Sequence, residues 1–203
     1  MKKLIVAFVF LHMFYSCNTS KYMTKQEINK IKEAGIETPM RVLLITDEQD
    51  SVFLRQKCRN IENIKGNADL QYFVERLHAT LDEEAGVGIA APQVGVGINL
   101  FLFMRLDMPD YPVHVAINPK ITGHSDEVVC FEADGCLSIP DFSGNSKRWA
   151  WIDVEYQNEK GEVVQERLEG YSRDSNFTGI IFQHEFDHLQ GVLFIDKLCD
   201  EED

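Results

Sequence analysis

The sequence is short of positive charge. Its 203 residues include 20 Lys and Arg against 33 Asp and Glu, which gives a formal net charge of −13 at pH 7. A surface of this charge repels a phosphate backbone, so nucleic acid is not expected as a partner. The chain also lacks internal repeats and low-complexity linkers. With 44% hydrophobic residues, its length is that of one compact domain with one substantial core.

Cysteine is present, but not in a disulfide pattern. Of the five cysteines, Cys58, Cys130 and Cys199 show no spacing typical of a disulfide framework, so they do not settle the redox environment. Cys136 differs because Gly135 precedes it and allows close backbone approach. Its side chain is either a small buried hydrophobe or a thiolate ligand for a metal.

The chain lacks the third histidine of the long zinc-peptidase pattern H-E-x-x-H-x-x-G-x-x-H. His184, His188 and Gly191 are present, but Phe194 occupies the last position. At i and i+4, the two imidazoles project from one face of a helix, close enough to bind one metal ion. A structural histidine pair on a core-facing helix is the alternative. Because a catalytic metal normally takes three protein ligands, a third ligand is expected elsewhere.

That ligand is expected upstream. The acidic cluster over residues 200–203 is explained more simply as a solvated tail. The thiolate of Cys136 with two imidazoles would form a three-ligand site with one open position. Glu185, between the histidines, would then lie where it can deprotonate a water. The backbone amide of Leu137 could point into the same cavity.

A segment of small residues, Gly86–Gly95, completes the set of informative motifs. Small side chains let a substrate or another backbone approach closely, and Gln93 offers an amide N–H as a donor to an oxyanion. A dinucleotide-binding loop is the competing interpretation. It is weak because the third glycine is missing and no strand is expected before the segment.

Together, the three motifs resemble those of peptide deformylase, the metalloenzyme that removes the N-formyl group from initiator methionine. The family's patterns G-Φ-G-Φ-A-A-x-Q, E-G-C-Φ-S and H-E-x-D-H (Φ, hydrophobic) occur here in that order, and flanking agreement extends from about Arg41 to Leu198. There are two departures. Asp134 stands where the family usually has Glu, and the connection over 169–179 is longer than usual.

The resemblance implies a substrate, a metal and residue roles. The substrate is an N-formylmethionyl peptide, and the cofactor is one divalent ion per chain, natively Fe²⁺ with Zn²⁺ as a stable substitute. Glu185 would move the proton, while Gln93 and Leu137 would stabilise the oxyanion. Helix geometry, rather than the resemblance, suggests a substrate pocket, because Ile180 and Ile181 lie four and three residues before His184 and share its face. With Val87 and Gly88 they would bind substrate, although ordinary core positions are the alternative for the apolar ones. Arg148 could pair with Asp134 or a substrate carboxylate, or could lie solvated on the surface.

The elements expected from apolar patterns and turn signals predict an α+β fold, with antiparallel or mixed sheets around a central metal-ligating helix. The predicted helices cover 68–84 and 177–190, the latter ended by Gly191. Asn158–Gly161 is a hairpin signal between the last two strands. The predicted strands cover 41–46, 98–104, 113–118, 152–156 and 163–168.

The N-terminus predicts export. Lys2 and Lys3 precede the apolar run Leu4–Phe14, which is too short to span a bilayer, and Cys17 follows. The layout resembles a bacterial lipoprotein signal with Cys17 as the lipidated residue. We therefore expect a signal at 1–17, a tether and short amphipathic helix at 18–38, and a deformylase-like catalytic domain at 39–203. The expected location is the cell envelope, by a lipid anchor; a cytoplasmic enzyme with an uncleaved extension is the alternative.

Two other functions stay open at this point. A zinc peptidase or other amidohydrolase would use the same ligands on an unformylated amide. A surface lipoprotein could instead bind metal or formylated peptides without turnover. Release of formate from formyl-Met-Ala would distinguish a deformylase from both of these alternatives. The sequence leaves the oligomeric state open.

Overall fold

The structure is a computed structural model and describes residues 21–200. The expected signal at 1–17 and the end of the acidic tail lie outside the described residues. The helices in chain order are α1 (Lys25–Ile31), α2 (Glu48–Leu54), α3 (Ala68–Glu83) and α4 (Thr178–Leu189), with short 3-10 turns at Ala91–Val94 and Phe194–Lys197. The strands are β1 (Gly88–Ala90), β2 (Leu100–Met104), β3 (Val113–His124), β4 (Val128–Cys136), β5 (Ile139–Trp149), β6 (Trp151–Gln157) and β7 (Val163–Glu169).

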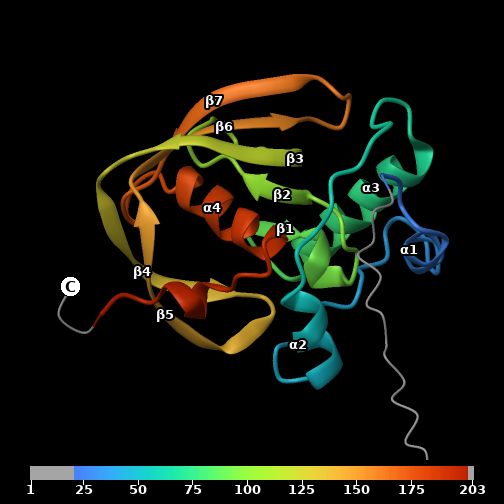
Figure 1. Ribbon diagram of the computed structural model, residues 1–203, viewed down its shortest axis with the longest axis horizontal. Helices are drawn as coiled ribbons and strands as arrows, with labels where there is room; N and C mark the ends of the chain where they lie inside the picture. Colours follow the sequence, from blue (N-terminus) through green and yellow to red (C-terminus); the bar gives the residue numbers. More distant parts are fainter. Residues whose placement is uncertain (1–20, 201–203) are drawn as a thin grey trace, which may run out of the picture.

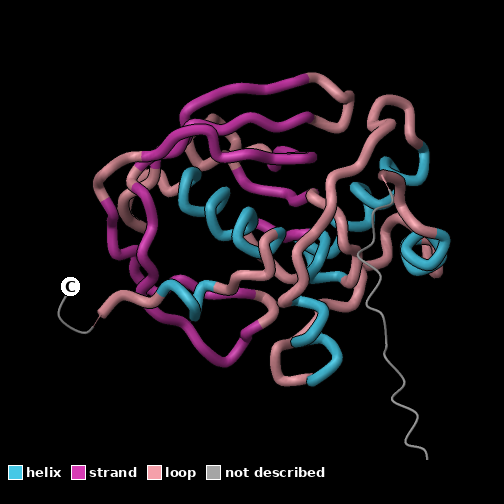
Figure 2. The backbone as a smooth tube through the Cα atoms, in the orientation of Figure 1, coloured by secondary structure: helices cyan, strands magenta, loops and turns pink. Residues whose placement is uncertain are grey.

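The strands form two antiparallel sheets with α4 between them. One sheet has the order β1-β2-β3-β6-β7, and the other is the β4–β5 pair. Helix α4 runs between the larger sheet and the pair (Figure 1). Figure 2 shows the helices α1, α2 and α3 gathered toward one end of the molecule. The predicted α+β fold around a central helix is confirmed.

Two apolar clusters hold these layers together. Phe101, Phe103 and Phe182 join the sheet to α4, with ring centroids 4.8 and 5.2 Å apart for the two pairs that include Phe182. A second cluster packs α3 against β1, β2 and β3 through residues such as Phe73 and Leu77. Because the apolar side chains of α4 face the sheet, its other face is free to carry polar side chains toward β4 and β5.

Most predicted elements are confirmed to within two residues, but β3 continues six residues past its predicted end, and one predicted strand is wrong. Residues 41–46 form no strand. Their N–H groups bond singly to different elements instead: Leu43 donates to the Gln93 carbonyl at 2.7 Å, and Ile45 donates to the Ser138 carbonyl at 3.0 Å. The apolar run therefore connects the segments that contain Gln93 and Ser138 rather than pairing with one strand.

The N-terminal helix packs on the domain. Arg76 of α3, which is 1% exposed, donates to the carbonyls of Ile31 at 3.0 Å and Thr38 at 2.9 Å. α1 is the helix expected within 18–38, although it ends at Ile31, and residues 21–40 are part of the folded structure. Among residues 21–200, no helix has the length and apolar character needed to cross a membrane.

Candidate metal centre

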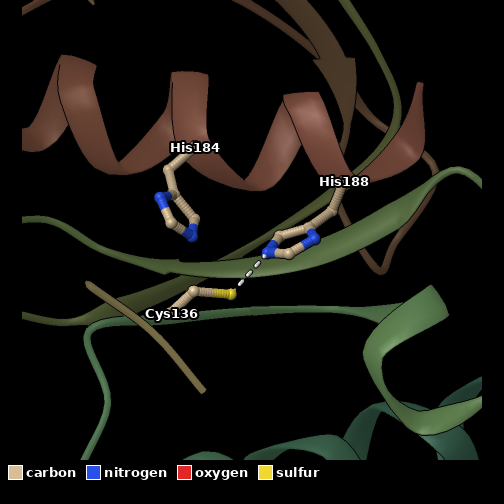
Figure 3. Close-up of side chains that lie close together, drawn as sticks. All are labelled: Cys136, His184 and His188. Atoms are coloured by element: carbon tan, nitrogen blue, oxygen red, sulfur yellow. Dashed lines mark hydrogen bonds between the residues drawn. The ribbon is translucent and has the colours of Figure 1, made fainter. Parts of the chain in front are cut away.

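Cys136, His184 and His188 converge at the centre of the molecule. One ligand atom from each residue lies within 4.8 Å of the others, and all three residues are buried. Cys136 Sγ lies 3.3 Å from His188 Nε2 (Figure 3). One sulfur and two imidazole nitrogens form the donor set of a catalytic transition-metal site with one open position.

The sequence places the ligands by two different local devices. The two histidines lie one turn apart on α4, which ends at Leu189, and Gly191 follows with φ of 73°. A Cβ at Gly191 would lie 2.3 Å from the Arg55 carbonyl oxygen, so only glycine fits there. Cys136 comes from the last position of β4, facing the helix.

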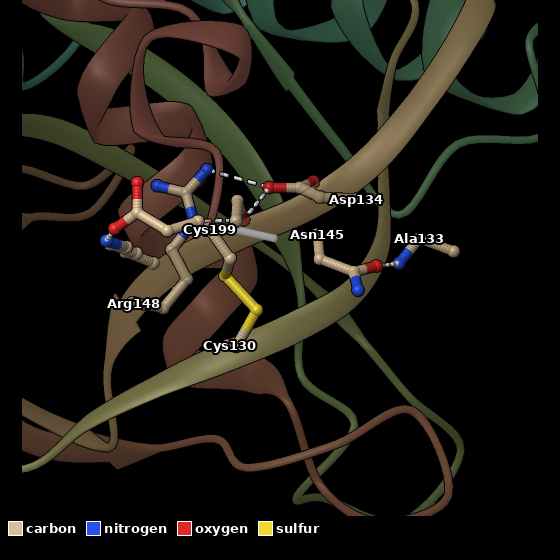
Figure 4. The surroundings of a disulfide bond; sticks show 9 residues. Cys130, Ala133, Asp134, Asn145, Arg148 and Cys199 are labelled. Carbon is tan, nitrogen blue, oxygen red and sulfur yellow. Dashed lines mark hydrogen bonds and ion pairs between the residues drawn. A yellow bond between two sulfur atoms is a disulfide. The ribbon is translucent and has the colours of Figure 1, made fainter. Parts of the chain in front are cut away.

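A bulge in β4 sets the direction of the residues before Cys136. The register with β5 shifts between Phe131 and Asp134, and Ala133 has φ of 49°. Its N–H is accepted by the Asn145 side chain at 3.1 Å (Figure 4). After the shift, Asp134 and Cys136 lie on the same buried face of the strand. The bulge thus turns a carboxylate as well as the thiolate toward α4.

That carboxylate orients one ligand. Asp134 Oδ1 lies 3.0 Å from His184 Nδ1, which leaves Nε2 of the same ring for a metal. Burial disfavours the charge on Asp134, but the charge and hydrogen bond of His184, the charge of Arg148 and the hydrogen bond from Ser146 outweigh it and hold the pKa of the carboxyl well below its ordinary value. Burial also lowers the pKa of His188, which keeps that ring neutral, the form that ligates metals.

Arg148 is not a solvated arginine. It is 1% exposed and donates to Asp134 Oδ2 at 2.8 Å and to Asp187 Oδ2 at 2.6 Å. Figure 4 shows Arg148 and Asp134 joined beside the β4–β5 pair. Burial opposes its charge, but the two carboxylates prevail and raise the pKa of the guanidinium. Of the interpretations considered for Arg148, pairing with Asp134 is the correct one.

Glu185 and Gln93 border the ligands. Glu185 is 4% exposed, and its Oε2 has no hydrogen-bond partner among the described residues. Burial raises the pKa of Glu185 to about 7. Gln93 Oε1 accepts from the Ala90 N–H at 2.8 Å, so its Nε2 turns toward Cys136 Sγ, 3.6 Å away. The unpartnered oxygen of Glu185 lies beside the three candidate metal ligands, where a water or substrate molecule could form a hydrogen bond with it.

A pocket of about 680 Å³ opens at this centre. Its lining includes the predicted substrate residues, with Ile180 and Ile181 buried and Val87 40% exposed. A Cβ at Gly88 would lie 2.5 Å from Glu185 Oε1, so the glycine lets the strand pass against the carboxylate. Leu137 also lines the pocket. Every residue predicted for the site therefore lies at one place.

Sequence reasoning missed several lining residues. Phe131 of β4, Phe142 of β5, and Arg173 and Phe177 of the long 169–179 connection all line the pocket. Arg173 lies 5.1 Å from the Phe131 ring centroid and donates to the carbonyls of Glu132 and Ala133. The length of the connection was the available signal. Nothing in it specified which of its residues would reach the pocket.

A disulfide joins Cys130 of β4 to Cys199 at the end of the chain, with Cα atoms 6.1 Å apart (Figure 4). Sequence spacing therefore did not reveal this disulfide, because its two cysteines lie 69 positions apart. The remaining described cysteines, Cys58 and Cys136, are free.

Comparison with known proteins agrees with this geometry. The family described as Polypeptide deformylase matches residues 41–203. "Peptide deformylase 2" of Nostoc sp. strain PCC 7120 is 43% identical over 152 residues, which cover 71% of this chain and 80% of the relative. The crystal structure of peptide deformylase from Thermotoga maritima superposes with a TM-score of 0.68 at 35% identity, covering 80% of this chain and 99% of that one. A Met-Ala-Ser-bound class I type b peptide deformylase from Acinetobacter baumannii gives 0.69 at 31% identity, with coverage of 80% and 99%.

Proposed function

The chain belongs to the peptide deformylase family, and from that premise we propose how its own residues carry out the reaction. It is a metal-dependent hydrolase that removes the N-formyl group from formylmethionyl peptides. The observation that carries the assignment of roles is the convergence of Cys136, His184 and His188 beside the unpaired carboxylate of Glu185. Hydrolysis of the formamide consumes one water and yields formate and a free amine.

The three ligands fit a divalent ion, natively Fe²⁺ with Zn²⁺ as a substitute. One thiolate and two imidazoles suit either metal, and the resemblance to the family's motifs favours iron. When bound, the ion supplies a Lewis acid and makes a nearby water acidic. Metal analysis of protein purified without oxygen tests the identity, since zinc as the main metal under those conditions would contradict iron.

Glu185 is the proposed proton carrier. Its carboxylate accepts a proton from the attacking water and returns it to the nitrogen of the leaving amine, so that the side chain ends as it began. The Gln93 amide and the Leu137 backbone N–H are the proposed donors to the formyl oxygen as negative charge develops there. Val87, Gly88, Ile180 and Ile181 are proposed to hold the methionine side chain and adjoining backbone.

The test is the release of formate from formyl-Met-Ala by Glu185→Gln. Because Gln keeps the shape and the metal ligands but cannot take the proton, kcat should fall by about 10²- to 10⁴-fold with metal content unchanged. Cys136→Ala is the companion variant and should lose metal. Parental turnover by Glu185→Gln would contradict its role, and cleavage of casein by the parent would favour a peptidase instead.

We further propose that the protein is anchored in the cell envelope by a lipid on Cys17, so that residues 1–17 act as a signal, 18–38 link it to the catalytic domain, and 39–203 form that domain. The Cys130–Cys199 disulfide supports this, because disulfides persist in oxidising compartments. Cell fractionation with mass spectrometry of the N-terminus is the test. An acylated Cys17 would support the anchor, whereas an unmodified Met1 in the soluble fraction would establish the cytoplasmic alternative.

A further inference from the structure

The hydroxyl of Ser146 lies between a guanidinium and the carboxylate that orients His184. Ser146 Oγ donates to Asp134 Oδ2 at 2.6 Å and accepts from Arg148 Nε at 3.1 Å. Ser146 is fully buried, with 0% exposure. Its position follows from the strand, because Ser146 and Arg148 are two residues apart on β5 and share its buried face.

The two oxygens of Asp134 have separate partners. Oδ1 faces His184 Nδ1, while Oδ2 accepts from both Ser146 and Arg148. Since the carboxylate is planar, fixing Oδ2 by two donors fixes the direction of Oδ1. The chain of contacts therefore runs from the guanidinium through the hydroxyl and the carboxylate to a metal-ligand ring.

This arrangement explains the departure at position 134. Aspartate is one methylene shorter than the glutamate of the family pattern, so its carboxylate lies closer to its own strand and farther from α4. Since Ser146 and His184 already lie 2.6 and 3.0 Å from this carboxylate, a longer side chain in the same orientation would have to displace one of them. A hydroxyl at 146 holds the short side chain, and by its volume it disfavours the long one.

We propose that Ser146 is a positioning residue for His184, acting through Asp134, and that Ser146 and Asp134 form a matched pair that replaces one longer carboxylate. The inference rests on the proposed role of His184 as a metal ligand. The competing account is that Ser146 only satisfies Arg148 Nε in the core. In that case its loss changes folding stability and leaves the metal site as it was.

The test measures metal retention, with activity as a second readout. Zn²⁺ affinity is measured by chelator competition, and the visible spectrum of the Co²⁺-substituted protein reports the ligand geometry. Ser146→Ala should weaken Zn²⁺ binding by about 10-fold, the lower end of what lost outer partners of ligands cost, and should shift the Co²⁺ bands. Asp134→Glu alone should weaken binding similarly, because the longer side chain meets the Ser146 hydroxyl.

The double variant is the decisive comparison. Removing the hydroxyl gives space to the longer carboxylate, so Asp134→Glu with Ser146→Ala should bind Zn²⁺ within about 3-fold of the parent, better than either single variant. Ser125→Ala is the matched control, since Ser125 is also buried and bonds Glu127 and Ala150 but lies outside the ligand set. It should lower the melting temperature and leave Zn²⁺ affinity unchanged.

Three outcomes would overturn the inference. Ser146→Ala could keep parental Zn²⁺ affinity and Co²⁺ spectrum, or the two single losses could simply add in the double variant. If Ser146→Ala does not fold, Ser146→Thr and Ser146→Val separate the hydroxyl from the shape of the side chain, and equal Zn²⁺ affinity for these two would also contradict it. By contrast, a Cys136→Ala variant that binds Zn²⁺ as the parent does would refute the proposed metal site itself.

Discussion

At the residue scale, Gly88 makes the close approach of β1 to Glu185 possible. A Cβ there would lie 2.5 Å from Glu185 Oε1, well inside van der Waals contact. Gly88→Ala should therefore displace the Glu185 carboxylate by up to about 1 Å. A misplacement of about 1 Å lowers the rate by about 100-fold, so kcat should fall by about that factor. The measurement is formate release together with metal analysis, which should show full metal content.

The control for that prediction is Gly35→Ala. A Cβ at Gly35 would have only the Thr38 hydroxyl oxygen within reach, at 4.0 Å, so it should be tolerated with parental activity. Loss of metal by Gly88→Ala would show that the variant disturbs the metal ligands rather than Glu185, contrary to expectation.

The relative positions of site residues were predictable where a motif fixes a local geometry. His184, Glu185 and His188 share one helix, so their relation follows from the period of 3.6 residues. Arg148 and Asp134 were harder, because their pairing depends on the register of β4 with β5. That register shifts twice, between Phe131 and Asp134 and again between Gly135 and Cys136. No local pattern encodes such shifts, and so Ser146 was not identified from sequence.

At the element scale, the carboxylate of Glu27 attaches α1 to the rest of the domain. Glu27 accepts from both Arg59 nitrogens, at 2.6 and 2.9 Å, from the Thr24 N–H at 2.7 Å and from the Gly97 N–H at 3.1 Å. Glu27→Ala should lower the free energy of unfolding at pH 7 by about 1–3 kcal/mol, the usual cost of lost hydrogen bonds to a charged group. Urea unfolding measures it, and the exposed Glu37→Ala should change little.

The pairing of Glu27 with Arg59 also predicts how the stability of the fold depends on pH. Burial opposes the charge of Glu27, but hydrogen bonds from Arg59 and Thr24 prevail and lower its pKa below the ordinary 4.5. A carboxylate with a lowered folded-state pKa stabilises the fold above its unfolded-state pKa, and that contribution is lost as the pH falls through the folded value. The stability difference between parent and Glu27→Ala should thus be constant near neutrality and shrink below about pH 4.5. A difference that grew in acid would contradict this.

Elements with a strong period were predicted well, and elements without one were not. Helices α3 and α4 and strands β2, β6 and β7 carry regular apolar patterns and agree closely with expectation. Strand β4 has an irregular pattern of burial, and β5 exposes most residues from Pro140 to Asn145. Both were missed. Residues 41–46 show the opposite case. Their composition is typical of a strand, but they form an extended segment whose N–H groups bond to several different elements.

At the scale of the whole molecule, the Cys130–Cys199 disulfide closes a loop of 69 residues that includes β5, β6, β7 and α4. A cross-link over a loop of this length stabilises a fold by up to about 4 kcal/mol through the unfolded chain. Cys199→Ser should lower the melting temperature accordingly. Treatment of the parent with a phosphine reductant should give the same shift, and the variant should show no further change with reductant.

If the reductant left the parent unchanged, the two cysteines would not be joined in solution. Activity of the reduced protein is informative as well. The loop contains Cys136 and both histidines, but their convergence depends on β4 and α4 packing rather than on the chain end. Formate release at low temperature should therefore survive reduction.

The placement of the disulfide has a consequence for biogenesis. Strand β4 carries Cys130 and, six positions later, the free thiol of Cys136, while the partner of Cys130 follows it by 69 positions. Along the chain, Cys136 is therefore much closer to Cys130 than Cys199 is, and a wrong bridge between Cys130 and Cys136 would remove one of the three proposed metal ligands. A metal ion held by Cys136 would withdraw that thiol from disulfide exchange, so we expect metal present during oxidative refolding to favour the Cys130–Cys199 pairing.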